Sequence, residues 1–315
     1  MMPKVSVVVV NFNGKKFLDD CLNSLAAQTY IDYEVIVVDN ASQDGSVEHI
    51  RSRFPWARIV LNKVNLGSTG GNNSGIREAC GEFIVTLNND TRVEKNFLEL
   101  LVGPMSDQSI GICGSKMVYP DGRINSTGLC LSRSGASWDR GASEEDLGQY
   151  DRQEEIFGAC AGAALFRKKM LDEIGLFDED FFIFMEDIDL TLRARYAGWR
   201  CIYVPDAIAH HLHGATAGVG SDLTVYYGNR NIMWLPAKNY PLPFLITCLP
   251  WILGRNLMVL PYYILKGKGR VVLKAKWDGL MGLPGMMAKR KNMLRKVPWS
   301  EVRRYISTWA GSRRA

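Results

Sequence analysis

The chain has 315 residues, of which 47% are hydrophobic and 23% charged. This balance excludes a disordered protein, and the length allows one α/β core with appendages. The seven cysteines are scattered, odd in number and never in CxxC spacing, which argues against a zinc site and for a reducing compartment. The apolar run Val5–Val10 is too short for a signal-peptide core, so we expect a cytoplasmic protein.

Charge is divided unevenly along the chain. Residues 241–315 carry 15 Lys and Arg against two acids, a net charge of +13, whereas the first 240 residues carry 23 basic and 31 acidic residues, a net charge of −8. This asymmetry indicates that the tail meets an anionic partner, either phospholipid or nucleic acid. The alternative is a solvated basic tail that only aids solubility.

The first hundred residues alternate strand and helix signals. The β-branched run Val5–Val10 is typical of a strand buried on both faces. Further strands are expected at 34–38, 58–61 and 83–87, and helices at 17–26, 47–53 and 71–80. This order predicts an α/β fold with a Rossmann-like, mostly parallel central sheet and flanking helices.

Less regular segments follow. Residues 104–160 are rich in glycine, serine and charge, and we interpret them as strands and loops. The apolar stretch Phe181–Met185 leads into a helix expected over Leu190–Tyr196, and Arg200–Val204 has the composition of another strand.

The sequence changes character after Tyr240. Residues 242–253 and 257–265 are almost entirely apolar, but Arg255 and prolines at 243, 250 and 261 interrupt them, and a spanning helix needs about 20 apolar residues. We therefore expect a re-entrant or interfacial segment, followed by a basic amphipathic tail that binds an anionic membrane surface. The alternative is that these helices simply pack on the rest of the protein.

The tail also contains three tryptophans, at positions 277, 299 and 309. Tryptophans can stack on bases in a nucleic-acid complex, but they fit a membrane interface equally well. Our preferred partner for residues 241–315 is lipid, with no nucleic acid.

Polar residues follow the predicted strands at the point where each ends. Asn11, Asp39, Asn65 and Asp90 all occupy such positions. In open parallel sheets, ligands bind beyond the carboxyl ends of the strands. The sequence therefore predicts a nucleotide-sized site there.

The triplet Asn88-Asn89-Asp90 resembles the metal-binding triplet of nucleotide-sugar transferases. A divalent ion held by Asp90 would neutralise the charge that develops on a diphosphate leaving group, and Mg²⁺ and Mn²⁺ prefer oxygen ligands. The alternative is a simple turn, since asparagine and aspartate favour turns.

Three acids in four residues, Glu186, Asp187 and Asp189, begin a predicted helix. Acids at this place also stabilise a helix N-terminus, which is the alternative interpretation. The apolar residues before them would desolvate a carboxylate and raise its proton affinity, as a general base requires.

Two further segments are candidates for ligand binding. His210, His211 and His213 lie close together, and neutral imidazole is a good metal ligand, although a surface histidine is as plausible. Residues 65–75 form a glycine-rich segment, interpreted as a loop entering a helix, that would let backbone amides approach a phosphate. It is neither GxGxxG nor a Walker motif.

Taken together, these motifs resemble the family 2 glycosyltransferases of the GT-A fold, in particular bacterial and archaeal rhamnosyltransferase-like members. The matching stretches are Val5–Gly14, Val35–Ser46, Asn65–Ile76, Leu87–Thr91, Gly158–Arg167 and Gly175–Arg195. The resemblance continues to the neighbourhood of His211 and to Arg230-Asn231. The Gln-x-x-Arg-Trp signature of processive synthases is absent, which favours addition of a single sugar.

The resemblance implies roles for individual residues. The implied donor-binding residues are Asn11, Asp39, Asp44, Asn65, Asn73, Asn88 and Asp90. A divalent metal, Mg²⁺ or Mn²⁺, would be held by Asp90 and His211. Asp187 would be the catalytic base of an inverting transfer, Glu186 would bind the acceptor, and Asp189 would support the helix.

The resemblance also implies a domain plan and an activity. A catalytic domain would occupy residues 1–235, with a nucleotide-binding half (1–103) and an acceptor-binding half (104–235), before a C-terminal extension (236–315). The expected reaction transfers a sugar from a dTDP- or UDP-sugar to a lipid-linked or cell-envelope glycan at the inner face of the cell membrane. The alternative is an inactive, membrane-associated protein that only binds nucleotide-sugars.

Overall fold

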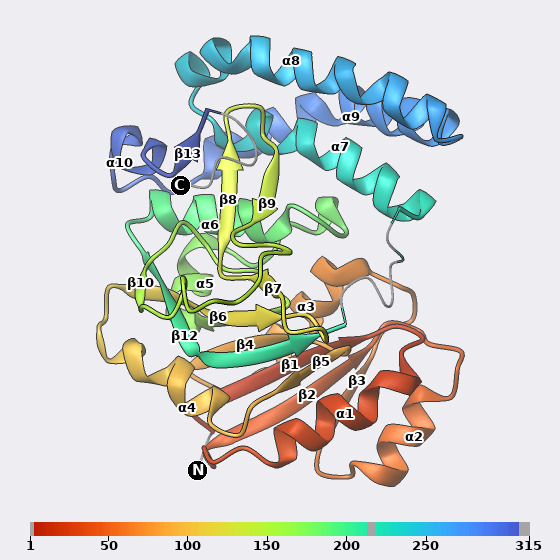
Figure 1. Cartoon of the computed structure of the whole chain (residues 1–315), viewed down its shortest axis with the longest axis vertical. Helices are drawn as coiled ribbons and strands as arrows, with labels where there is room; N and C mark the ends of the chain where they lie inside the picture. The colour runs from red at the N-terminus through yellow and green to blue at the C-terminus, as the bar shows by residue number, and fades with distance from the viewer. Residues whose placement is uncertain (1–2, 213–217, 219, 309–315) are drawn as a thin grey trace.

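The computed structural model describes residues 3–212, 218 and 220–308. A ten-stranded mixed sheet runs through its centre, with helices on both faces and a further helical layer above (Figure 1). The main strand order is β10-β12-β6-β11-β4-β1-β2-β3, with β5 paired to β12 and β7 to β6. The strands are β1 (Val5–Asn11), β2 (Tyr33–Asp39), β3 (Arg58–Leu61), β4 (Phe83–Asn88), β5 (Thr91–Val93), β6 (Ile110–Val118), β7 (Ile124–Ser126), β10 (Glu154–Glu155), β11 (Ala163–Arg167) and β12 (Arg200–His211).

The first half is a parallel α/β unit, as the sequence predicted. Strand β1 pairs in parallel with β2 and β4, and β2 pairs in parallel with β3. Val5, Val7 and Val9 pack in the same core cluster as the buried side chains of α1 (Lys15–Ala26), whereas Val8 packs on the opposite face with Ile76. Successive side chains of a strand point to opposite faces, so a strand made mostly of valine suits a sheet covered on both sides.

The glycine-rich segment forms a helix where we expected a loop. Helix α3 (Gly67–Glu78) begins four residues earlier than predicted. A Cβ atom on Gly71 would lie 2.6 Å from Val10 Cγ1, and one on Gly75 would lie 2.4 Å from Val8 Cγ1. These glycines therefore let the helix backbone pack directly on the sheet, a tertiary advantage that outweighs their poor helix propensity.

The second half of the sheet is mixed. Strand β11 runs antiparallel between β4 and β6, while β12 runs parallel to β6. Strand β12 extends to His211, seven residues beyond the strand expected from the sequence, and its end pairs with β5. The other helices of residues 3–212 are α2 (Ser46–Arg53), α4 (Phe97–Val102), α5 (Lys168–Ile174) and α6 (Glu186–Tyr196), with 3-10 turns η1 (Gly103–Ser106) and η2 (Glu179–Phe181).

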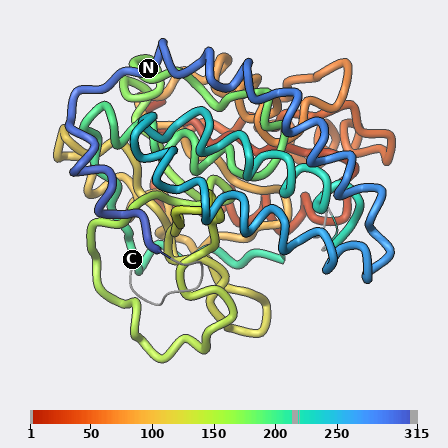
Figure 2. The backbone as a smooth tube through the Cα atoms, turned by 90° about the horizontal axis from the view of Figure 1, so that it is seen from above, coloured from red at the N-terminus to blue at the C-terminus, as the bar shows by residue number. Residues whose placement is uncertain are grey.

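Three long helices cover one side of the molecule, where they lie side by side (Figure 2). They are α7 (Asp222–Asn239), α8 (Leu242–Leu265) and α9 (Gly269–Lys289). Helix α9 packs against both α7 and α8. The boundary expected at residues 235/236 falls inside α7.

The prolines do not break α8, contrary to expectation. Pro250 and Pro261 both lie inside one continuous helix of 24 residues. Each proline removes a single backbone hydrogen bond, but its fixed φ is helical, so the helix continues. By length and composition α8 is the one helix in the described residues that is able to cross a membrane, and its most apolar window is only 11% buried.

The C-terminal part of the described chain packs against strands from the middle of the sequence. After η3 (Arg290–Asn292) and α10 (Trp299–Arg303), strand β13 (Ile306–Ser307) pairs with β8 (Leu129–Ser132), which in turn pairs with β9 (Ser137–Asp139). Trp299 stacks on Tyr196, with 5.7 Å between ring centroids, so it is a packing residue rather than a platform for bases. Trp277 is 64% exposed, and Trp309 lies outside the described residues.

Candidate active site

Polar side chains at the ends of β1, β2 and β4 form one hydrogen-bonded row. The amide of Asn11 donates to Asp39 Oδ1 at 3.1 Å, and Asn89 Nδ2 donates to Asn11 Oδ1 at 2.8 Å. All three residues are buried. The sequence pointed to Asn11 and Asp39 but not to Asn89, because nothing in the triplet itself distinguishes the asparagine that turns inward from the one that stays exposed.

Asp44 closes the loop that follows β2. Its carboxylate accepts hydrogen bonds from the backbone of Lys15 at 2.9 Å and from the backbone and hydroxyl of Ser46. Partial burial opposes ionisation, but these hydrogen bonds outweigh it and lower the pKa of Asp44. The loop is thereby held against the start of α1, beside the row formed by Asn11 and Asp39.

The side chains of Asn65 and Asn73 form hydrogen bonds with other residues of the protein. Asn65 Oδ1 accepts from the backbone N–H of Gly67 at 2.9 Å, at the start of α3. Asn73 donates to Phe177 O at 2.8 Å and to Glu179 at 2.9 Å, and its oxygen accepts from the backbone of Phe177. These bonds tie α3 to the segment before α6, and contacts of the two asparagines with a donor stay predictions.

Asp90 and His211 face each other at the end of β12. His211 Nε2 lies 3.2 Å from Asp90 Oδ1 and 3.2 Å from the amide nitrogen of Asn88. His211 Nδ1 lies 2.8 Å from Asn125 Oδ1, an acceptor, so we assign the ring proton to Nδ1, which leaves Nε2 as the acceptor nitrogen beside Asp90 and the Asn88 amide. Residues 121 positions apart are thus brought into contact by the pairing of β12 with β5.

The other histidines of this segment differ in their surroundings. His210 lies next to His211 on the strand, so it points to the opposite face, where its Nε2 is 2.7 Å from Glu94. His213 lies outside the described residues. Within those residues, no group of three or more His, Cys, Asp or Glu side chains is arranged to hold a metal ion.

The segment before α6 is held in an unusual conformation. Phe182, Phe184 and Met185 all have positive φ angles, of 64°, 67° and 71°. Such angles are costly for bulky residues and persist only where the surroundings enforce them. The amide of Asn231, in α7, donates to the carbonyls of residues 181, 183 and 184 at 2.8–2.9 Å.

Helix α3 holds the same segment from the other side. The carbonyl of Phe182 accepts from the backbone N–H of Thr69 at 3.2 Å. A Cβ atom on Gly67 would lie 2.2 Å from that carbonyl oxygen, so only glycine allows this approach. The start of α6 is therefore positioned jointly by α3 and α7.

Glu186 and Asp187 begin α6 in a poorly solvated environment. Burial raises the pKa of Asp187 well above its usual range, and repulsion from Glu186 and Asp139 adds to the effect. Burial also raises the pKa of Glu186, although Ser68 Oγ donates to its Oε1 at 2.5 Å. The second oxygen of Glu186 is buried without a hydrogen-bond partner among the described residues.

Asp139, at the end of β9, is a further acid that the sequence did not single out. Burial raises its pKa, while a hydrogen bond from Ser126 and the nearby His211 oppose the rise. Its Oδ1 is buried and has no hydrogen-bond partner within the described part of the chain. The backbone of Ala161 donates to Asp187, and the next residue, Gly162, accepts at 2.9 Å from the backbone N–H of Asn88, whose side chain lies 3.2 Å from His211. This short segment therefore connects the two groups of candidate residues.

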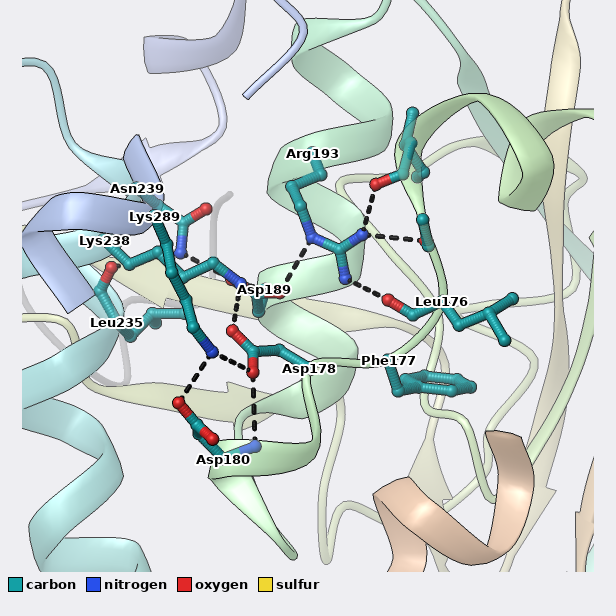
Figure 3. A network of polar contacts seen from close by, with 12 residues as sticks. Leu176, Phe177, Asp178, Asp180, Asp189, Arg193, Leu235, Lys238, Asn239 and Lys289 are labelled. Carbon is teal, nitrogen blue, oxygen red and sulfur yellow. Dashed lines mark hydrogen bonds and ion pairs between the residues drawn. The ribbon is translucent and has the colours of Figure 1, made fainter. Parts of the chain in front are cut away.

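Asp189, the last acid of the motif, lies in an ion-pair network with residues of α6 and α7 (Figure 3). Its carboxylate accepts from Arg193 at 2.9 Å, Lys238 at 2.8 Å and Asn239 at 2.9 Å. Burial alone would raise the pKa of Asp189, but attraction to Lys238 and Arg193 outweighs burial and lowers it well below the usual range. Lys238 also binds Asp178 at 2.7 Å.

The parallel half of the sheet and the row of polar strand ends lie in a part of the chain that a known family matches. The model of glycosyl transferase family 2 matches residues 6–175, more than half of the chain, and the chain belongs to this family. A solved mannosyltransferase, PcManGT from Pyrobaculum calidifontis in complex with GDP-Man and Mn²⁺, superimposes with a TM-score of 0.56 at 18% identity, over 93% of this chain and 85% of that one. The expected GT-A fold is confirmed.

Relatives by sequence include proteins of known and unknown activity. An N-acetylglucosaminyl-diphospho-decaprenol L-rhamnosyltransferase of Mycobacterium tuberculosis is 28% identical over 262 residues, 74% of this chain and 84% of the relative. The uncharacterized protein y4gI of Sinorhizobium fredii is 25% identical over 231 residues, 69% of this chain but only 25% of that protein. The predicted resemblance to rhamnosyltransferase-like family members is confirmed.

Removing the lysine of the network should destabilise the fold. We expect Lys238→Met to lower the free energy of unfolding by about 3 kcal/mol, because it leaves buried carboxylates at 178 and 189 short of a cation. Urea denaturation at neutral pH measures the change. Lys274→Met, which breaks an exposed pair with Asp278, is the matched control and should cost little. Equal losses in the two variants would contradict a special role for the network.

Proposed function

We propose that this chain is an inverting, metal-dependent glycosyltransferase that moves a sugar from a nucleoside diphosphate sugar to a hydroxyl of a lipid-linked or cell-envelope glycan. The observation that carries the proposal is that one short segment bonds to both groups of candidate residues: Ala161 to Asp187, and the next residue, Gly162, to Asn88, which lies 3.2 Å from His211. We infer that a site for a diphosphate and a site for a base adjoin each other, as direct displacement at a sugar requires.

The nucleotide would bind at the carboxyl ends of β1 and β2. Asn11 and Asp39 lie there side by side, with Asp44 in the adjoining loop. Carboxylate and amide oxygens are suited to accept hydrogen bonds from a base and a ribose. We assign donor binding to these residues and also to Asn65, Asn73, Asn88 and Asp90. A dTDP- or UDP-sugar is the proposed donor.

Asp90 and His211 fit a divalent cation, Mg²⁺ or Mn²⁺. A carboxylate oxygen and an imidazole lone pair face each other at 3.2 Å, and Asn125 fixes the ring orientation from the far side. Two acceptors at this distance are favourably arranged when a cation binds both. Such an ion would neutralise charge on the departing diphosphate. The solved mannosyltransferase complex contains Mn²⁺ together with GDP-Man, which supports this assignment.

Asp187 would act as the general base. Its carboxylate would take the proton of the acceptor hydroxyl, whose oxygen attacks the anomeric carbon as the bond from that carbon to the diphosphate breaks. A single displacement inverts the anomeric configuration and forms no covalent bond between sugar and enzyme. The desolvated surroundings of Asp187 raise its proton affinity, which strengthens it as a base once it is ionised.

Glu186 and Asp139 would bind the acceptor. Each has a buried carboxylate oxygen without a partner among the described residues. A buried acceptor atom is costly when unpaired, and a sugar hydroxyl would supply the missing donor. We therefore assign acceptor binding to both residues, Asp139 in addition to the residue expected from the sequence.

The acceptor would be presented at the cytoplasmic face of a membrane. The rhamnosyltransferase relative is named for a decaprenol-linked sugar, and α8 exposes most of its apolar surface. We propose peripheral or monotopic attachment through residues 241–315, with residues 1–103 and 104–235 binding donor and acceptor respectively. The seven cysteines are all free, consistent with a reducing compartment.

A second candidate is a protein that binds nucleotide-sugars without catalysis. The buried, unpartnered carboxylates favour the enzyme, because a protein that only binds the nucleotide would not need acids at the acceptor side. Screening nucleotide-sugars for metal-dependent transfer or hydrolysis separates the two candidates.

The base assignment is tested by Asp187→Asn. We expect transfer to fall by about 10²–10⁴-fold, because the amide cannot take a proton, while donor affinity stays within a few-fold. Turnover and calorimetric nucleotide binding are measured in parallel. Asp172→Asn, an exposed acid of α5, serves as the control and should remain active. Near wild-type turnover in Asp187→Asn would overturn the assignment.

The pH dependence of turnover should respond to Glu186. The rate should rise with pH as Asp187 ionises, and repulsion from Glu186 helps to place that rise above the usual range of a carboxyl. Glu186→Gln removes the repulsion and should move the acidic limb of the kcat profile to lower pH. A limb that stays in place, or moves to higher pH, would show that Asp187 is not the titrating base.

Metal binding is tested by comparing the two neighbouring histidines. His211→Ala should weaken Mn²⁺ binding in the presence of a nucleoside diphosphate by about tenfold or more, as measured by electron paramagnetic resonance of free Mn²⁺. His210→Ala, on the opposite face of β12, should leave Mn²⁺ affinity unchanged. Identical behaviour of the two variants would refute the ligand role of His211.

A further inference from the structure

Two basic side chains meet between the long helices, away from the candidate active site. Arg255 lies in the middle of α8 and Lys276 in the middle of α9. Lys276 Nζ donates to Asn256 Oδ1 at 2.5 Å and to the backbone carbonyl of Asn229, in α7, at 3.0 Å. Both of these acceptors are neutral. Arg255 Nη1 is buried and has no hydrogen-bond partner among the described residues.

The two cations are close enough to repel each other. Burial and the positive charge of Arg255 lower the pKa of Lys276 to about 7. Burial likewise lowers the pKa of Arg255, and only the phenol of Tyr263 counteracts it. Placing two cations together in a partly desolvated position is unfavourable unless an anion joins them.

Arg255 and Lys276 are half-buried, whereas the cations that are almost fully buried in the described part of this protein are paired with acids. Lys116 binds Asp146 and Asp151, and Arg195 binds Glu155. In residues 3–212, 218 and 220–308, neither Arg255 nor Lys276 forms an ion pair with an acid of the chain. The nearest acid of α9 along the sequence, Asp278, is already bound to Tyr226 and Lys274. Among the described residues, no acid therefore neutralises the charges of Arg255 and Lys276.

The surface around this pair is apolar. Leu253, Leu257 and Met258 of α8 are 57%, 65% and 76% exposed, and Trp277 of α9 is 64% exposed. A small soluble anion would leave these side chains in water, whereas a lipid would cover them and bring a phosphate to the cations. Two cations match the charge of a terminal phosphate or a diphosphate better than the single charge of a phosphodiester.

We propose that Arg255 and Lys276 form a binding site for the terminal phosphate or diphosphate of a membrane lipid, whose hydrocarbon chain lies on the exposed apolar residues of α8 and α9. The site stands apart from the residues assigned to transfer, so it does not require the proposed reaction. It gives the basic extension a specific lipid ligand in addition to general attraction to an anionic surface.

Vesicle binding of the full chain tests the site. Phosphatidylcholine vesicles are prepared with phosphatidic acid, with undecaprenyl diphosphate, or with phosphatidylglycerol at matched total charge. We expect binding to the first two to exceed binding to the third by about tenfold. Arg255→Gln and Lys276→Gln should each abolish that preference. Arg270→Gln, an exposed change of equal charge at the start of α9, should retain it, and Lys276→Arg should too.

The outcomes are distinct. Preference for undecaprenyl diphosphate over phosphatidic acid would identify a lipid carrier as ligand, and the reverse would identify a bulk phospholipid. Equal binding to all three anionic vesicles, or an equal loss in Arg270→Gln, would overturn the proposal. Inorganic diphosphate is also titrated by calorimetry in the absence of lipid. Tight binding that is lost in Arg255→Gln would overturn the assignment of a lipid as the ligand. None of these measurements depends on turnover, so an inactive enzyme would leave them interpretable.

Discussion

The buried carboxylate of Asp189 is the interaction on which the arrangement of this site depends. An ionised carboxylate without exposure to water is tolerated only when cations and hydrogen-bond donors surround it, and Arg193, Lys238 and Asn239 do so. Two of these partners belong to α7, so the network joins α6 to the layer of long helices. Since Asp187 lies two residues earlier in α6, its direction is set by the same bonds. Asn231, also in α7, then holds the preceding turn in its positive-φ conformation.

The stabilisation supplied by that network is balanced by unfavourable features on the other side of α6. Glu186, Asp187 and Asp139 are acids in surroundings that raise their pKa values, and two of them keep a buried oxygen without a partner among the described residues. Strain and poor solvation of this kind concentrate at functional sites, where a ligand completes what the protein leaves incomplete. The ion pairs of Asp189 thus offset the unfavourable free energy of burying the carboxyl groups of Glu186, Asp187 and Asp139.

The helical layer connects the candidate active site to the apolar face of the molecule. Helix α7 contacts the strained segment through Asn231 and Tyr227 and packs along α9, and α9 in turn contacts α8. A ligand held between α8 and α9 would therefore be connected to α6, which carries Asp187, through α7. The uneven charge of the sequence fits this arrangement, because many basic residues of the C-terminal part lie on the same helices that expose apolar surface.

Local pattern in the sequence determined the parallel first half of the sheet, the polar strand ends at Asn11 and Asp39, the acids at 186–189 and the family resemblance. These features follow from side-chain periodicity and from motifs whose residues are neighbours along the chain. The tertiary structure alone decided that Asn89 rather than Asn88 turns inward, that Asp139 joins the site, and that Asn125 orients His211. It also decided that the glycines of α3 form a helix. Each of these depends on contacts between segments far apart in sequence, whose energies outweigh local preference and leave no periodic trace in the chain.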